Sequence, residues 1–198
     1  WLVTLSFIVD NYWAANSSIG SVQKRISSYI HKQEKDLASL VKDTAIQQKI
    51  LSKRYSEEFL KQLISKKYFL FFYKPGSNGR EQLVFWNSNQ VLPFPSLLYD
   101  SGSSGTVKLE NGYYVWYRFK AGELTTIGLI PVKWSYNILN GYLSNDFVNN
   151  ASISPKYDIT LEQGKGVAIK SINGNSLFNI IEVPGKSDNR DNIFSVIL

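Results

Sequence analysis

The sequence contains no cysteine, no methionine and one histidine among its 198 residues. Without cysteine, the chain can form no disulfide, thiol nucleophile or thiolate metal site. A Ser-His-Asp triad would depend on His31 alone, and zinc would have to be held by scattered carboxylates. We therefore predict that this chain is not an enzyme and needs no cofactor or metal. Because no methionine is present, we expect the chain to be a fragment or a processed form.

The chain also lacks a complete membrane-spanning run. Its N-terminal apolar stretch, 1–9, stops at Asp10, whereas a spanning helix needs about 20 apolar residues. We interpret residues 1–16 as the end of a truncated membrane helix with its juxtamembrane segment. Trp1 and Trp13 would then suit a membrane interface. The alternative is a short apolar helix that docks on the folded domain itself.

Basic residues outnumber acidic residues in the first third of the chain. Of the 22 Lys and Arg and 16 Asp and Glu, 11 basic and 6 acidic residues lie in 1–67, so this part carries most of the net charge of +6. Such a surplus can indicate nucleic-acid binding. Mixed signs at Lys32, Glu34, Lys35 and Asp36 favour a solvated helix face instead. We predict no nucleic-acid partner.

A helical repeat of mostly apolar residues lies within Ser17 to Leu51. Its members follow one another by three or four positions: Ile19, Val22, Ile26, Tyr29, Gln33, Leu37, Leu40, Thr44, Gln48 and Leu51. The pattern predicts one unbroken helix of roughly 50 Å. Polar residues within the stripe argue against a coiled-coil seam along its whole length. We expect part of the stripe to pack on the rest of the chain and part to form a homodimer.

A second, shorter helix is expected after Ser56, a residue type favoured as an N-cap. Glu57 and Glu58 would occupy the first turn, where acids favour the helix dipole. The predicted buried face comprises Phe59, Leu60, Leu63 and Ile64.

Five strands are expected in the middle of the chain. The first two, separated by a glycine-rich turn, are 68–73 and 81–86. An irregular crossover, 87–105, then leads to a meander of three strands: 106–110, 113–120 and 124–132. Two-residue turns such as Asn111-Gly112 predict that the meander is antiparallel.

A small β unit is expected at the C-terminal end, in residues 151–198. Its strand candidates are 157–161, 167–172, 177–181 and 193–198, with a hairpin turn at Asn173-Gly174. The segment from Lys133 to Phe147 favours a helix that Gly141 weakens. The domain division is therefore 1–16, 17–150 as the core, and 151–198.

The strand 113–120 gives the best argument for a binding site. Side chains alternate across a sheet, so Tyr113, Val115, Tyr117 and Phe119 should pack against the long helix. The other face carries Tyr114, Trp116 and Arg118, an aromatic floor with a guanidinium that can pair with a carboxylate. The alternative is a solvent-facing surface without a ligand. The candidate binding residues, including those from the crossover and the strand ends, are Trp86, Tyr99, Asp100, Tyr114, Trp116, Arg118 and Trp134.

This order of elements resembles the PAS-like extracytoplasmic sensor domains known as Cache domains. The stretches 113–120 and 127–134 resemble the last core strands of that family. The stretch 166–178 resembles a periplasmic segment of bacterial sensor histidine kinases. The resemblance implies an α+β fold: a long N-terminal helix on a PAS-like antiparallel five-stranded sheet, plus the small β unit.

The resemblance also implies a function. We expect the extracytoplasmic, periplasmic sensor domain of a two-component histidine kinase anchored in the inner membrane. It would detect a small anionic or zwitterionic ligand or a protein partner, and signal through the long helix. A first alternative is the sensor domain of a chemoreceptor or diguanylate cyclase. A second is a periplasmic carbohydrate- or protein-binding module.

Overall fold

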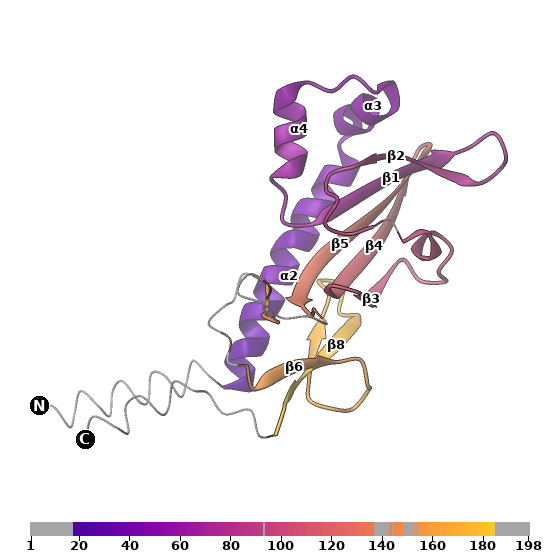
Figure 1. The fold of residues 1–198 in the computed structure, drawn as a ribbon. Coiled ribbons are helices and arrows are strands. Elements are labelled where there is room, and N and C mark those ends of the chain that lie inside the picture. Colours follow the sequence, from indigo (N-terminus) through magenta and orange to yellow (C-terminus); the bar gives the residue numbers. More distant parts are fainter. Residues whose placement is uncertain are drawn as a thin grey trace, which may run out of the picture.

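The computed structural model describes residues 18–92, 94–136, 143, 145–148, 153 and 155–184. The fold is α+β, as expected. One long helix runs beside a five-stranded antiparallel sheet and, further along its length, a three-stranded antiparallel sheet (Figure 1). The predicted apolar segment 1–16 and the strand candidate 193–198 lie outside the described residues.

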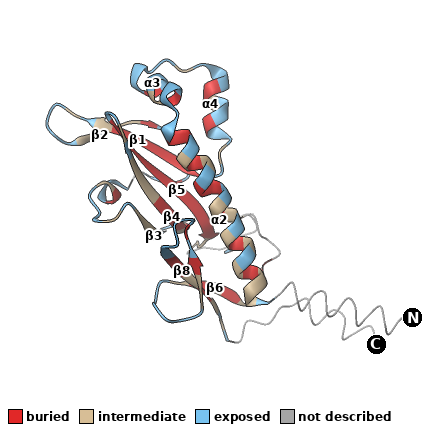
Figure 2. Cartoon of the chain, turned by 180° about the vertical axis from the view of Figure 1, so that it is seen from behind, coloured by how far each residue is buried: buried red, intermediate tan, exposed pale blue. Residues whose placement is uncertain are grey.

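The long helix α2 spans Ile19–Lys42 and begins at Ser18, whose side chain accepts a hydrogen bond from the Ser21 amide. At about 1.5 Å per residue its 24 residues extend about 36 Å. One side of the helix is buried and the other is exposed (Figure 2). The buried residues are Val22, Ile26, Ile30, Gln33, Glu34, Leu37, Leu40 and Val41.

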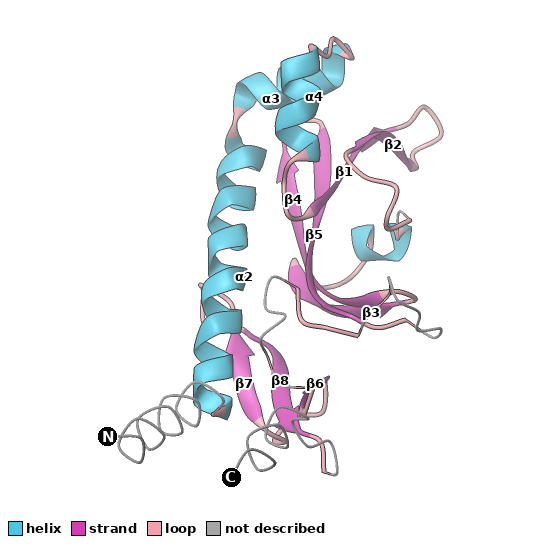
Figure 3. Ribbon diagram, turned by 60° about the vertical axis from the view of Figure 1, so that its left-hand side comes forward, coloured by secondary structure: helices cyan, strands magenta, loops and turns pink. Residues whose placement is uncertain are grey.

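The prediction of an unbroken helix to Leu51 was wrong, because the chain leaves the helix at Asp43. This residue has an extended conformation, and its carboxylate accepts hydrogen bonds from the amides of Ala45 and Ile46. Asp43 is thus the N-cap of a new helix, α3 (Thr44–Ser52), which turns away from the axis of α2 (Figure 3).

The second predicted helix is present as α4 (Glu57–Ile64). Ser56 caps it as expected, its hydroxyl accepting a hydrogen bond from the Phe59 amide at 3.2 Å. Phe59 and Leu63 are buried, but the prediction that Ile64 belongs to the buried face was wrong, since this side chain is exposed.

The larger sheet has the strand order β2-β1-β5-β4-β3. Its strands are β1 (Phe69–Pro75), β2 (Glu81–Trp86), β3 (Ser104–Leu109), β4 (Gly112–Ala121) and β5 (Leu124–Trp134). The predicted meander is confirmed, since β4 pairs antiparallel with both β3 and β5. The central strand β5 carries a nearly continuous run of buried residues, as expected for a strand covered on both faces.

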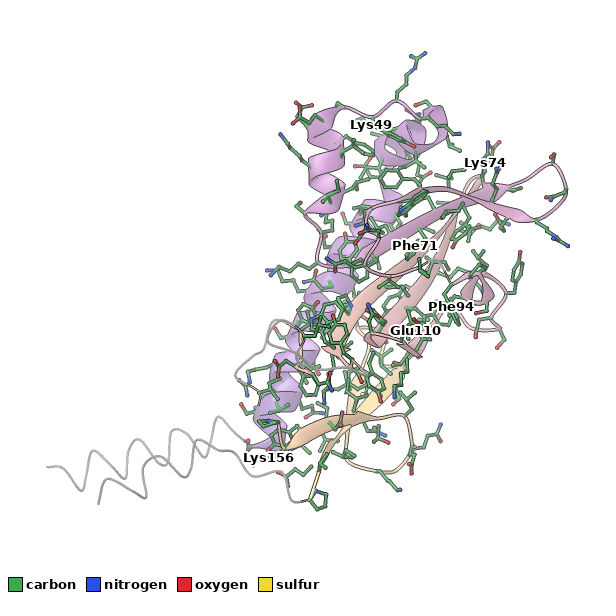
Figure 4. All side chains as sticks on the ribbon, viewed as in Figure 1. Lys49, Phe71, Lys74, Phe94, Glu110 and Lys156 are labelled. Atoms are coloured by element: carbon green, nitrogen blue, oxygen red, sulfur yellow. The ribbon has the colours of Figure 1, made fainter. Side chains whose placement is uncertain are left out.

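Each face of this sheet is covered by a different part of the chain. The helix α2 covers one face and comes so close that Gly128 on β5 lies directly against Leu37. The other face is covered by the crossover between β2 and β3, which includes the 3₁₀ helix η1 (Pro95–Leu98). Figure 4 marks Phe71 on β1 and Phe94 on this crossover.

The smaller sheet comprises β6 (Tyr157–Thr160), β7 (Val167–Lys170) and β8 (Ser176–Glu182), in the order β6-β8-β7. The predicted hairpin turn joins β7 to β8, where the Gly174 amide donates to the Ser171 carbonyl at 3.0 Å. Gly174 has a φ of +84°, which glycine adopts without the steric penalty of a side chain.

The two sheets and α2 share one hydrophobic core. Polar contacts also tie the sheets together. The ammonium of Lys133 on β5 lies 2.7 Å from Oδ1 of Asp158 on β6, and the Thr106 hydroxyl donates to the Leu177 carbonyl at 2.9 Å. The small β unit therefore packs as an integral part of the molecule.

The expectation of a helix from Lys133 to Phe147 is corrected at its described ends. Lys133 belongs to β5 and forms an isolated antiparallel bridge with Phe147. Residues 137–142 and 144 lie outside the described part. Among the described residues, no helix is both long and apolar enough to cross a membrane.

Candidate functional site

The two predicted faces of β4 are present. Tyr113, Val115, Tyr117 and Phe119 belong to the core beneath α2, whereas Tyr114 and Trp116 lie on the opposite face. Tyr114 is fully buried, and Trp116 is 4% exposed. Burial raises the pKa of the Tyr114 phenol far above its usual value. This aromatic surface is thus covered by the chain itself.

The predicted anion-binding residue Arg118 contacts the backbone of the crossover. Its guanidinium donates hydrogen bonds to four carbonyl groups at 2.7–3.2 Å, those of Leu97, Leu98, Asp100 and Gly102. Arg118 therefore holds the crossover on the sheet, and a carboxylate ligand would have to compete with these carbonyls.

The remaining predicted site residues are dispersed around this face. The rings of Tyr114 and Trp134 lie 6.3 Å apart. Trp86 lies on the edge strand β2, and its side chain is exposed, as is that of Tyr99. Asp100 is exposed, and its carboxylate accepts a hydrogen bond from the Gly102 amide at 2.8 Å. The structure brings Tyr114 and Trp134 together, whereas the guanidinium of Arg118 contacts the crossover.

A different polar cluster, which we did not expect from the sequence, joins α2 to the edge strand β7. Three side chains of α2 reach backbone groups of alternate residues along this edge. Gln23 donates to the Ala168 carbonyl at 2.8 Å, the His31 ring contacts the Lys170 carbonyl at 2.9 Å, and Glu34 accepts from the Ile172 amide at 3.0 Å. The unpaired backbone groups of an edge strand can pair with another chain, and here side chains of α2 occupy three of these groups.

His31 is therefore not simply the solvated helix-surface residue that the sequence favoured. Because a carbonyl can only accept, Nε2 of His31 must carry the hydrogen in this contact. His31 thus joins α2 to the β7 backbone.

Glu34 is the centre of this cluster and is 7% exposed. One carboxylate oxygen accepts from the Tyr117 hydroxyl on β4, and the other accepts from the Ile172 amide in the β7–β8 turn. Burial raises the pKa of Glu34, although the bond from Ile172 and the charge of His31 act in the opposite direction. One carboxylate consequently joins the helix, the large sheet and the small sheet.

A hollow of about 390 Å³ lies beside Glu34. It is lined by α2 residues, by Tyr117 and Phe119 of β4, and by Ile172 and Asn173 of the β7–β8 turn. A sequence signal for this site did exist. Ile30, Glu34 and Leu37 follow one another at helical spacing, which places an acid on the apolar face.

The most exposed positions of α2 carry lysine or serine: Lys24, Ser28, Lys32, Lys35, Ser39 and Lys42. Of the two acids expected on this face, Glu34 is buried, whereas the Asp36 side chain is 45% exposed and pairs with Lys66. The Asp36 carboxylate accepts from Lys66 and from the Tyr68 hydroxyl at 2.7–3.0 Å. Although burial raises the Asp36 pKa, these bonds and the charges of Lys66 and Lys32 lower it below its usual value.

Within the described ranges, no group of three or more His, Cys, Asp or Glu side chains could hold a metal ion. Comparisons with protein-family models, curated proteins and solved structures found no match.

Proposed function

We propose that this chain is the extracytoplasmic, signal-sensing domain of a two-component sensor histidine kinase anchored in the inner membrane. The chain itself would not be an enzyme, and the catalytic part would lie elsewhere in the full-length protein. The order of elements supports this proposal. One long helix, two short helices, two strands, a crossover and three meandering strands follow one another. Apart from the break between α2 and α3, this is the order of the PAS-like sensor domains that the sequence resembles.

The observation that carries the proposal is the position of α2. Its buried face packs against the large sheet, through contacts such as that of Leu37 with Gly128. Its side chains Gln23, His31 and Glu34 also bind the edge of the small sheet. A shift of either sheet would therefore be transmitted to the helix.

Signalling requires two arrangements of the domain, with different affinities for the signal. Cores and interfaces change between discrete packings rather than by smooth deformation. The polar bonds between α2 and β7 are suited to such a change, because each joins a side chain to a backbone group and can be exchanged for water. In this proposal, the signal changes how β7 and the β7–β8 turn sit against α2.

The expected homodimer remains part of the proposal, with a constraint on its geometry. The apolar stripe of α2, including Ile26 and Leu37, is buried within the same chain. A dimer through α2 would have to use the exposed lysine face, where like charges repel. Because salt screens such charges, we expect dimerisation to strengthen between about 50 mM and about 500 mM salt. Sedimentation equilibrium would measure this. A dimer that weakens with salt would have to form elsewhere.

The decisive test of the function uses the full-length protein in membrane vesicles with ATP. Histidine autophosphorylation is expected, with a rate that changes at least about fivefold in a Gln23→Ala/Glu34→Ala variant, the lower end of typical coupling. Lys108→Ala, an exposed position on β3, is the matched control and should leave the rate unchanged. A full-length protein without a kinase region would overturn the proposed output.

The location can be tested separately, because the chain contains no cysteine. A Ser28→Cys variant, on the exposed side of α2, should react with a membrane-impermeant maleimide in cells whose inner membrane is intact. The unsubstituted full-length protein is the control. Labelling only after lysis of the inner membrane would contradict an extracytoplasmic location.

A second candidate function, a periplasmic carbohydrate- or protein-binding module, is favoured by exposed apolar side chains. Trp86, Leu92, Phe94 and Tyr99 are all exposed on β2 or on the crossover that follows it. Aromatic residues are common at binding surfaces. This candidate predicts that Trp86→Ala abolishes binding to a glycan array or a captured partner. Retained binding in this variant would count against it.

A further inference from the structure

The hollow beside Glu34 has the size of a small-molecule site. Its volume of about 390 Å³ lies within the range of about 300–1,000 Å³ that is typical of ligand pockets. It lies where α2, β4 and the β7–β8 turn meet, so an occupant would contact all three parts of the molecule at once. These are the same three parts that Glu34 joins.

The charge at this hollow is positive. Lys35 and Lys42 line it from the exposed side of α2. They are separated by two helical turns, or about 10 Å along the axis. Glu34 is the only carboxylate among the described lining residues, and both of its oxygens already accept hydrogen bonds from Tyr117 and Ile172. The ammonium groups are therefore the charges that a ligand would meet.

The walls of the hollow suit a flat, cyclic body. Two of its lining side chains, Tyr117 and Phe119, have stacked rings, with centroids 6.2 Å apart and an angle of 27° between their planes. The small α2 residues Ala38 and Ser39 also line it. A ring can thus lie on the aromatic side chains while a charged substituent extends toward a lysine.

We propose that this hollow binds a small cyclic organic carboxylate, with its ring on Tyr117 and Phe119 and its carboxylate on Lys35 or Lys42. The ligand would contact the β7–β8 turn at Ile172 and Asn173, beside the bond between Glu34 and the Ile172 amide. Binding would thereby favour one arrangement of the turn against α2. This inference rests on the proposed sensor function and names the ligand class and site for it.

The test is a titration of the ¹⁵N-labelled chain with benzoate, phenylacetate and glucuronate, followed by NMR. We expect at least one of these probes to shift the amide signals of Ile172 and Asn173 in a saturable manner below about 10 mM. Benzamide and glucose, the neutral counterparts, should bind at least about tenfold more weakly, since charge-assisted bonds are the strong ones.

Two variants and one matched control locate the site. Lys35→Ala/Lys42→Ala should weaken binding at least about tenfold. Ala38→Phe should abolish it by filling the hollow. The control Lys24→Ala/Lys32→Ala removes the same charge from the same face of α2, away from this hollow, and should retain the affinity. Circular dichroism establishes that each variant is folded.

Several outcomes would overturn the proposal: no shift with any of the three carboxylates, equal binding of the neutral counterparts, or full affinity in Lys35→Ala/Lys42→Ala. Failure of the ligand site is distinguishable from failure of the sensor function. Autophosphorylation of the full-length protein that responds to Gln23→Ala/Glu34→Ala, without binding of these probes, would refute the site alone.

Discussion

The close contact between Gly128 and Leu37 gives the sharpest test of how α2 lies on the large sheet. A Cβ added at Gly128 would lie 2.5 Å from Cδ2 and 2.9 Å from Cδ1 of Leu37, which is fully buried. No ordinary carbon–carbon contact is so short. Gly128→Ala must therefore displace either Leu37 or the helix.

The expected magnitudes follow from packing energetics. Overpacking in Gly128→Ala should lower the free energy of unfolding by about 1–3 kcal/mol. The cavity in Leu37→Ala should lower it by about 2–5 kcal/mol. In the double variant the new methyl at position 128 occupies part of that cavity. The combined loss should then be smaller than the sum by about 0.5–3 kcal/mol.

Urea unfolding of the four proteins, followed by circular dichroism, measures these energies. Gly20→Ala serves as the control, because this glycine lies in α2, as Leu37 does, and a Cβ there would meet no atom within 4 Å. Because Gly20 lies in the first turn of α2, the control should change the free energy of unfolding by less than about 1 kcal/mol. Additive losses at Gly128 and Leu37, or a neutral Gly128→Ala, would refute the packing of α2 described above.

Three further predictions concern polar side chains that bond to distant parts of the chain. Because its folded-state pKa is raised, Glu34 binds its proton more tightly in the folded than in the unfolded chain. The free energy of unfolding of the wild type, relative to that of Glu34→Gln, should therefore fall as pH rises from the usual carboxyl range to the folded pKa. If the urea midpoint of the wild type instead rose relative to that of Glu34→Gln over this range, the prediction would be contradicted. Asn87→Ala should cost more than about 2 kcal/mol in urea unfolding, since it leaves the buried Leu70 amide without its acceptor; a loss below this would show that the bond is dispensable. Arg118→Lys keeps the charge but loses the planar guanidinium whose two terminal nitrogens bind the crossover carbonyls. Limited proteolysis should therefore cut within 95–103 faster in this variant; an unchanged rate would contradict that role.

The large sheet could be predicted because its signals are local. Alternation along Tyr113–Lys120 and the turns that flank it were sufficient to place β4, its partners and its two faces. The break in the long helix was missed because Thr44, Gln48 and Leu51 continue the helical period. Only the structure shows that the carboxylate of Asp43 caps a new helix instead.

The candidate site was harder to predict because its contacts join distant parts of the chain to backbone groups. Spacing placed Arg118 on the correct face of β4, but nothing in the sequence indicated that carbonyls of the crossover would occupy its guanidinium. The buried position of Glu34 could have been noticed. Its partners, Tyr117 and Ile172, could not, since they lie 83 and 138 positions away.

The central claim is that Glu34 joins α2 to the small sheet through the Ile172 amide, and hydrogen exchange at that amide tests it most directly. In the wild type this amide should be protected by its bond to Glu34. In Glu34→Ala its exchange should accelerate at least about tenfold, while the Gly174 amide, bonded within the turn to Ser171, keeps its rate. Equal exchange of the Ile172 amide in the two proteins would contradict the claim.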